Sequence, residues 1–346
     1  PLTDGRVKVL LPAMSRYGTR LLARSFNRIG VRAEALPPAD EEALKLGRGN
    51  SSCKECLPLQ TTIGSLLQYL ADRPTDEVAA YYMPSARGPC RFGQYNVFSQ
   101  RVIAKHQLRD VAVMAPSSEN GYSGLGDRFM RAAWRGMIIG DLFDEMWSTV
   151  LAGAEDREEG LALLEREYQH ILAVIDRGWM TVAARLSESA KALAGLRLKR
   201  PYHEIPKISL VGEIYVRHDP ISLQGLIERL ADRGFAVRTA PNSEWIKYID
   251  WLVNNRIEGD RDMGFRVRGA VKTYLDRRIR KRLQPSGLFF VDGHAGVEPI
   301  IEAGRRFISP HFTCEAILTV GAALHEILHP SCGVISIGPF GCMPSR

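Results

Sequence analysis

Cysteines beside glycines and prolines are the residues of this chain best suited to chemistry. The sequence has six of them, namely Cys53, Cys56, Cys90, Cys314, Cys332 and Cys342. A structural cysteine normally lies within an apolar run, where it packs as a small hydrophobic side chain. Most of these cysteines occupy polar turns, where a thiolate can face a shared cavity. Their placement therefore favours metal or iron–sulfur ligation over core packing.

The spacing of the first two cysteines leaves several chemistries open. Cys53-x-x-Cys56 fits a redox pair, half of a zinc site or half of an iron–sulfur site. A closed zinc site needs four ligands, which Cys53, Cys56, Cys90 and Cys342 could supply. An iron–sulfur site would use the same thiolates. Disulfides would be expected in a secreted chain, but in a chain expected to be cytoplasmic the thiols stay reduced.

Length and composition indicate a two-domain globular protein. A chain of 346 residues can form two hydrophobic cores, and its charged share of 25% is typical of globular proteins. No apolar run reaches the roughly 20 residues that cross a bilayer, so we expect no membrane association. The net charge of +7 could favour an acidic partner. The basic run 276–282 has no interleaved aromatic residues, which predicts a solvated helix face rather than nucleic-acid binding.

Hydrophobic periodicity predicts an α/β protein with two Rossmann-like lobes facing a cleft and a helical insertion between them. We expect a first lobe over 1–120, a helical bridge over 121–205 and a second lobe over 206–346. The predicted strands are 7–11, 31–35, 78–83, 111–115, 207–212, 235–239, 288–292, 306–309 and 333–338. Ligands of such sheets bind beyond the carboxyl ends of the strands, where Cys90 and Cys342 would lie.

Several motifs together resemble one family. They are Lys54-Glu-Cys-Leu-Pro58 before a Thr-Thr-x-Gly-x-Leu-Leu helix, Met83-Pro-x-x-x-Gly-Pro-Cys-Arg-Phe-Gly-Gln-Tyr95, Gly212-Glu-Ile-Tyr-Val-Arg217 and Gly338-Pro-Phe-Gly-Cys-Met-Pro344. With them the chain resembles the cluster-bearing part of the 2-hydroxyacyl-CoA dehydratase and benzoyl-CoA reductase superfamily, closest to its activase-associated branch. The resemblance runs from Val7 to Pro344.

The resemblance implies that Cys56, Cys90 and Cys342 hold a [4Fe-4S] cluster. Cys53, Cys314 and Cys332 depart from the common pattern. Six thiolates could serve two cubanes, which resembles the family's double-cubane [8Fe-9S] proteins and puts an ordinary dehydratase role in doubt. The resemblance also implies a homodimer and an activator ATPase, separate or fused, with its own iron–sulfur cluster. The expected function is reduction of a small molecule or an acyl-CoA.

Charged residues beside the cysteines have two predicted roles. Lys54, Arg87 and Arg91 could offset cluster charge, and the two arginines could also dock the activator. No catalytic residue is assigned. The alternatives to a reductase are a non-catalytic electron relay, a cluster scaffold and a zinc module.

Three further motifs carry weaker signals. His325-Glu-Ile-Leu-His329 matches the zinc-protease pattern, but it ends at a proline and suggests no third ligand. The loop 121–126 is glycine-rich without the lysine of a P-loop, so we assign no ATP site. Glu213, Arg217 and His218 follow a predicted strand and either enter the cleft or form a buried salt bridge.

Overall fold

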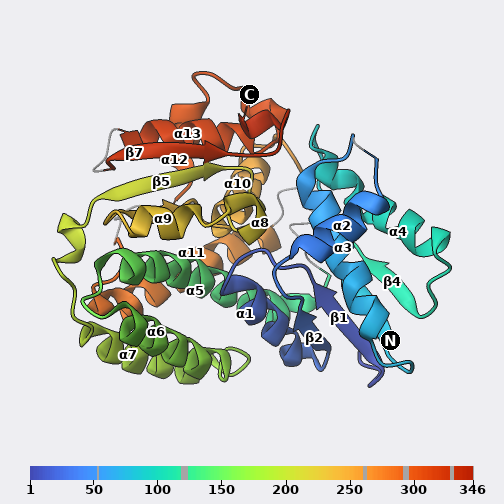
Figure 1. Ribbon diagram of the computed structural model, residues 1–346, viewed down its shortest axis with the longest axis horizontal. Helices are drawn as coiled ribbons and strands as arrows, with labels where there is room; N and C mark the ends of the chain where they lie inside the picture. The colour runs from blue at the N-terminus through green and yellow to red at the C-terminus, as the bar shows by residue number, and fades with distance from the viewer. Residues whose placement is uncertain (53, 118–123, 260–262, 291–295, 328–330, 346) are drawn as a thin grey trace.

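The strands of the computed structural model form two parallel sheets (Figure 1). The model describes residues 1–52, 54–117, 124–259, 263–290, 296–327 and 331–345. Within them, the N-terminal sheet has the order β2-β1-β3-β4 and the C-terminal sheet the order β6-β5-β7. The strands are β1 (Val7–Leu11), β2 (Arg32–Ala35), β3 (Val78–Tyr82), β4 (Val111–Met114), β5 (Lys207–Gly212), β6 (Ala236–Thr239) and β7 (Gly333–Ile337). The predicted α/β class is confirmed.

Helices make up most of the remaining described chain. They are α1 (Gly18–Ser25), α2 (Glu41–Gly49), α3 (Leu57–Asp72), α4 (Tyr95–Lys105), α5 (Gly126–Gly153), α6 (Arg157–Leu172), α7 (Trp179–Ala194), α8 (Pro220–Leu223), α9 (Leu226–Ala231), α10 (Ser243–Asn254), α11 (Met263–Leu283), α12 (Glu298–Gly304) and α13 (Ala316–Ile327). No helix in the described part is long and apolar enough to cross a membrane.

Each sheet is covered on both faces, as expected for parallel strands. In β1, Leu10 packs with residues of α3 and α4, whereas Val9 and Leu11 pack with residues of α1 and the start of α5. In β5, Leu210 packs with α9 and the end of α5, whereas Val211 faces α12 and α13. Alternating side chains of one strand therefore enter two separate cores.

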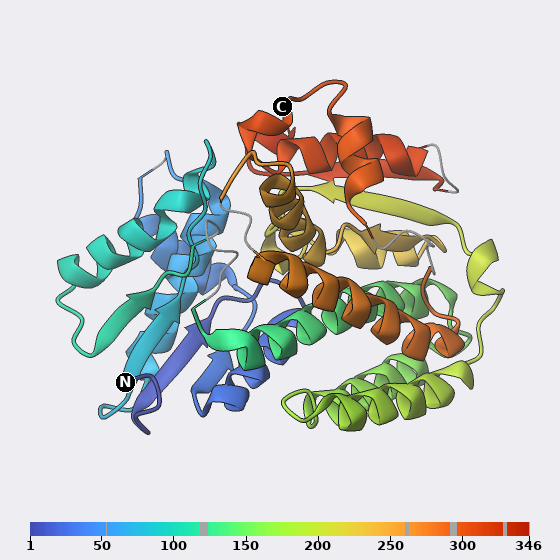
Figure 2. The same ribbon diagram turned by 180° about the vertical axis from the view of Figure 1, so that it is seen from behind.

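Helix α5 contacts both sheets. Phe129, near its start, packs in the core of the N-terminal sheet, and Leu151, near its end, packs in the core of the C-terminal sheet. Between these ends, α5 forms the largest core with α6, α7 and α11. Figures 1 and 2 show the N-terminal sheet on one side of this helical layer and the C-terminal sheet above it. The segment expected as a bridge thus shares its core with α11, which is far away in the sequence.

Two expected strands are wrong, and two helices went unpredicted. Residues 306–309 form a turn, in which the N–H groups of Phe307 and Ile308 donate to the carbonyl of Gly304. Leu288 and Phe289 are buried in the helical core without strand pairing, and 291–292 lie outside the described residues. The unpredicted helices are α2 and α12. Leu288 and Phe289 are buried by helices, whereas Phe307 is exposed, so neither apolar pair marks a strand.

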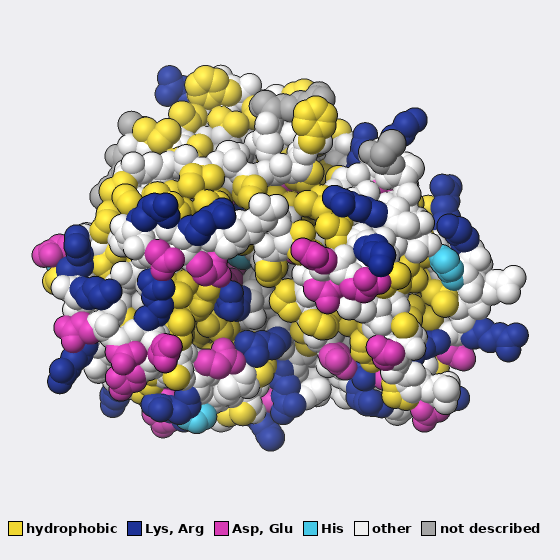
Figure 3. All heavy atoms as spheres, viewed as in Figure 1, with side chains coloured by type: hydrophobic (Ala, Val, Ile, Leu, Met, Phe, Trp, Pro, Cys, Tyr) yellow, Lys and Arg dark blue, Asp and Glu magenta, His cyan; other side chains and the backbone are white. Residues whose placement is uncertain are grey.

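The basic run 276–282 is only partly a solvated face. It belongs to α11, in which Ile279 is buried in the helical core and Asp276 is also buried. Arg280 and Lys247 both pair with Asp276. Figure 3 shows blue and magenta side chains interspersed over one face of the molecule rather than gathered by sign.

Helices α2 and α3 approach each other at two glycines. A Cβ atom at Gly64 would lie 1.7 Å from the carbonyl oxygen of Ala43, and one at Gly47 would lie 1.7 Å from that of Gln60. The obstructing atoms are backbone, so a side chain at either position must move a whole helix. This contact fixes α3, whose N-terminus carries Cys56.

We expect Gly64→Ala to lower the free energy of unfolding by about 3 kcal/mol, because it overpacks a backbone contact. Urea unfolding followed by circular dichroism measures this. Gly49→Ala is the matched control, since no atom lies within 4 Å of its added Cβ. It should be neutral or stabilising. Equal stability of the two variants would contradict the close approach of α2 and α3.

Candidate thiolate site between the two sheets

The strand order creates one reversal point in each sheet. In the N-terminal sheet the chain goes from β1 out to β2 and then returns to β3 on the other side of β1. In the C-terminal sheet it goes from β5 to β6 and returns to β7 on the other side of β5. Loops diverge at such points and leave a crevice at the carboxyl ends of the strands. Cys90 follows β3, Glu213 follows β5 and Cys342 follows β7.

Cys56 is the residue that caps the N-terminus of α3. Its carbonyl accepts hydrogen bonds from Leu59 and Gln60, and Pro58 lies in the first turn, where its missing N–H costs nothing. The Cys56 thiol is half-buried and lies 2.5 Å from the hydroxyl of Tyr95. Helix α3 therefore directs its positive end toward this sulfur.

The Cys90 loop contacts the C-terminal half of the chain. Gly88 has φ +97°, and a Cβ atom there would lie 2.8 Å from the carbonyl oxygen of Thr313. Cys90 itself caps the short 3-10 helix Arg91–Gln94 and keeps exposed surface. The guanidinium of Arg91 donates to the carbonyl of Lys54. This hydrogen bond connects the loop that carries Cys56 with the loop that carries Cys90.

The thiols of Cys56, Cys90 and Cys342 are electrostatic neighbours. Burial is the main cause that raises the pKa of Cys90 to about 11 and that of Cys342 to about 12, and it also raises the pKa of Cys56. The Cys56 thiol contributes to the rise at Cys90, and both contribute at Cys342. These three predicted ligands, which come from both sheets, therefore lie near enough to influence one another electrostatically.

Glu213 is a half-buried acidic residue beside this thiol group. It raises the pKa of all three thiols, and burial raises the pKa of its own carboxyl group. One carboxylate oxygen accepts hydrogen bonds from the N–H groups of Tyr215 and Val216. These bonds hold the side chain in the loop after β5.

A buried ion pair supports the Glu213 loop. Arg217 pairs with Glu315 at 3.0 Å and donates to the carbonyl of Gly212. Burial raises the pKa of Glu315 to about 8. Arg217 thus forms the salt bridge that was one of its two predicted roles. His218 is also buried, 3.7 Å from Asp144, and burial lowers its pKa to about 3.

The remaining cysteines do not join this group among the described residues. Cys314 is buried, and the groups that shift the pKa of its thiol are burial, Glu315 and backbone N–H groups. Cys332 is exposed directly before β7, at the opposite end of that strand from Cys342. Cys53 lies outside the described residues.

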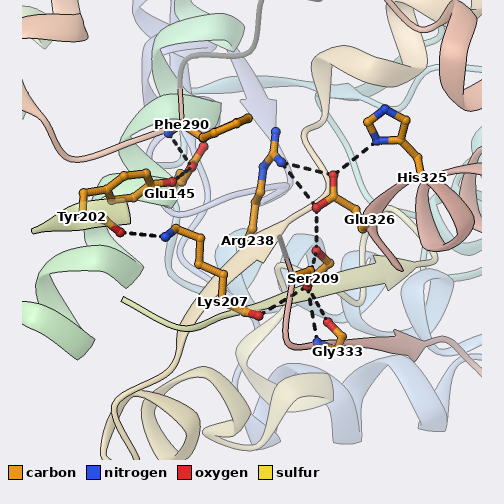
Figure 4. A network of polar contacts seen from close by, with 10 residues as sticks. Glu145, Tyr202, Lys207, Ser209, Arg238, Phe290, His325, Glu326 and Gly333 are labelled. Carbon is orange, nitrogen blue, oxygen red and sulfur yellow. Dashed lines mark hydrogen bonds and ion pairs between the residues drawn. The ribbon is translucent and has the colours of Figure 1, made fainter. Parts of the chain in front are cut away.

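The H-E-x-x-H segment forms a different contact. Figure 4 shows His325 and Arg238 both directed toward Glu326. Glu326 accepts from Ser209 at 2.9 Å and pairs with Arg238 at 3.1 Å, so its carboxylate is held in a salt bridge. His329 lies outside the described residues, as do 121–123 of the glycine-rich loop.

Comparison with other proteins adds no relative. A scan against protein-family models finds no match, and searches of curated proteins and of solved structures find none either. Among the described residues, no three His, Cys, Asp or Glu side chains are arranged to hold a single metal ion. A cubane binds each thiolate through a different iron, so its ligands stand further apart than those of one ion.

Sequence reasoning missed two members of the site. Tyr95 was quoted within a motif without a role, yet its hydroxyl contacts the Cys56 thiol. Glu315 follows Cys314 directly and was not singled out. Its charged neighbours Arg217 and Glu213 lie about 100 positions earlier in the sequence. Of these two residues, only Tyr95 could have been found from the sequence, because it ends the Gly-Gln-Tyr part of a motif that also contains Cys90.

We expect the thiols of Cys90 and Cys342 to alkylate slowly at pH 8 in reduced, metal-free protein. With pKa values of about 11 and about 12, roughly one molecule in a thousand or fewer carries the thiolate at that pH. Peptide-resolved mass spectrometry after iodoacetamide treatment measures the rates, with the exposed Cys332 as internal reference. Raising the pH to 10 should accelerate Cys90 and Cys342 most. Labelling as fast as at Cys332 at pH 8 would contradict the raised pKa values.

Proposed function

We propose that this chain holds a [4Fe-4S] cluster on Cys56, Cys90 and Cys342 and acts as the cluster-bearing component of an ATP-dependent reductase. The observation that carries the proposal is the convergence of these three thiols from the start of α3 and from the two strand-reversal points. Residues so far apart in sequence have no local reason to meet. Together with the sequence resemblance, this supports a shared ligand.

The donor set fits an iron–sulfur cluster. Thiolates are the usual protein ligands of such clusters, and three of them leave one corner of a cubane without a cysteine. When bound, the cluster would supply single electrons of low potential. The residue Cys90 keeps exposed surface, although burial of its thiol raises the pKa, so the loop that carries it is open to solvent on this side of the site. This exposure favours a reductase over the alternative of a sealed electron relay.

One cluster agrees with the described residues better than two. A double-cubane site would need three further thiolates close to the first three. Cys332 lies at the far end of β7, and Cys314 shares no thiol neighbour with the group. We therefore propose one [4Fe-4S] unit rather than an [8Fe-9S] assembly.

The proposal requires a partner that supplies electrons. The sequence contains no P-loop motif. An activator ATPase with its own iron–sulfur cluster, separate or fused, would deliver the electrons to a homodimer of this chain. The substrate class is an acyl-CoA or another small molecule. Glu213 would orient the loop after β5 and exclude water on the C-terminal side of the site.

We expect reconstitution under anaerobic conditions to give about four irons per chain, the content of one [4Fe-4S] unit. Cys56→Ser, Cys90→Ser and Cys342→Ser should each lose most of this iron and acid-labile sulfide. Cys332→Ser is the matched control and should retain both. Full iron content in Cys90→Ser, or an equal loss in Cys332→Ser, would contradict the ligand assignment.

We expect charge reversal at Arg87 to slow reduction of the cluster by the activator several-fold at low salt. Arg87 is exposed three residues before Cys90, and electrostatic attraction between proteins is screened by salt. Arg91 is less suitable, because its guanidinium holds the Lys54 carbonyl. The measurement is the stopped-flow rate of cluster reduction in Arg87→Glu at two salt concentrations, with Arg229→Glu as control. An unchanged rate with normal iron content would remove Arg87 from the docking surface.

A further inference from the structure

A second cavity lies in the C-terminal half of the molecule. Its volume is about 140 Å³, and it lies between the face of β5 and β6 and the helices α10, α12 and α13. No cysteine lines it. One wall is the polar network of Figure 4, in which Arg238 and Ser209 contact Glu326. The other wall carries Lys247 and Arg280.

Two cations at this cavity share one carboxylate. Lys247 Nζ and Arg280 Nε each lie 2.7 Å from an oxygen of Asp276, which is 1% exposed. Two positive charges against one negative charge leave a surplus of one. The terminal Nη groups of Arg280 have no hydrogen-bond partner among the described residues. The pair can therefore receive one further anionic group.

Glu244 is a buried side chain on the same cavity. It is 5% exposed, lines the cavity and has no hydrogen bond from its carboxyl group within the described chain. Burial raises the pKa of its carboxyl group to about 7. The charged groups that interact with it are Arg217, Lys247, Asp141, Glu315 and Glu326. Once protonated, Glu244 can donate a hydrogen bond to an anion instead of repelling it.

The rest of the lining is mostly apolar and limits the size of a ligand. Its apolar members are Val211, Ala240, Pro241, Val297, Pro299, Ile300 and Ala322, and Thr239, Gly296 and His325 complete the lining. An engineered cavity of about 150 Å³ holds benzene, with six non-hydrogen atoms. A lining that combines two cations having one surplus positive charge with apolar side chains, around a volume of this size, matches a short carboxylic acid.

We propose that this cavity binds a short-chain carboxylate of about six non-hydrogen atoms. The carboxylate accepts hydrogen bonds from Lys247 and Arg280, the protonated Glu244 donates to it, and the hydrocarbon tail lies against Ala322 and Ile300. Such charge-assisted hydrogen bonds are the strong ones in a partly dehydrated site. The inference does not depend on a cluster at the cysteines, because the cavity contains none of them.

The experiment is a calorimetric titration of the full chain with n-butyrate, which has six non-hydrogen atoms. We expect saturable binding with one site per chain at pH 6. Butylamine has a tail of similar length with the opposite charge and should not bind. Inorganic phosphate should bind more weakly, because it cannot use the apolar wall. Absence of butyrate binding, or tighter binding of phosphate, would overturn the proposal.

Three variants test whether butyrate binds in this cavity. Arg280→Gln should weaken butyrate binding roughly ten- to a hundredfold, the usual effect of losing a hydrogen bond to a charged group. Ala322→Leu fills the cavity without changing charge and should abolish binding. Arg277→Gln removes the same charge from an exposed position of α11 and should bind like the wild type. Wild-type affinity in Ala322→Leu, with the fold intact by circular dichroism, would place the ligand elsewhere.

The role of Glu244 has its own test. Butyrate is ionised at both pH 6 and pH 8.5. A weaker affinity at pH 8.5 would therefore come from a change of protonation in the protein and not in the ligand. Other charged groups also line the cavity, so a variant of Glu244 itself is necessary. Glu244→Gln should bind butyrate several-fold more tightly than the wild type at pH 8.5, because it keeps a donor and loses the charge. Unchanged affinity in this variant would remove Glu244 from the site.

Discussion

Helix α5 packs its first turns on the N-terminal sheet and its last turns on the C-terminal sheet, and the arrangement of both sheets depends on this double contact. With 28 residues at 1.5 Å each, it is about 42 Å long, enough to reach from one core to the other. Its middle is fixed in the helical core with α6, α7 and α11. Because one rigid element joins both halves, the loops at the carboxyl ends of both sheets are held toward each other.

The thiol group at this junction is held by the backbone as much as by side chains. The close approach of Gly88 to Thr313 joins the Cys90 loop to the C-terminal half of the chain. The Arg91 contact with Lys54 joins the two loops of the N-terminal half. A site built from three separate loops keeps its geometry only if such contacts hold them together.

Acidic groups surround this site and give it a distinct electrostatic character. Glu213 and Glu315 both contribute to the raised pKa of Cys90 and Cys342. Net charge and hydrogen bonding near a cluster set its reduction potential. Burial favours the neutral form of both carboxyl groups, so their protonation would respond to the charge of a cluster bound here. Glu244 acts electrostatically on Glu315 and lines the second cavity, so the two sites share one buried charge network.

The sequence by itself determined the elements whose cause is local. Alternation and apolar runs located β1 and β5 to the residue, and the glycine- and proline-flanked cysteines indicated which loops could hold a ligand. Even α2 had a readable signal, since Asp40 caps it by accepting from the N–H of Ala43. The wrong strand at 306–309 shows the limit, because two adjacent apolar residues do not reveal whether they will be buried, and Phe307 is exposed in the structure. Tertiary structure decided the rest. Cys332 and Cys342 lie on either side of one strand and look equally suitable in sequence, yet a parallel strand sends its two ends to opposite edges of the sheet. The thiols of Cys56, Cys90 and Cys342 influence one another only because chain crossovers and α5 hold distant loops near each other, and no local pattern encodes that arrangement.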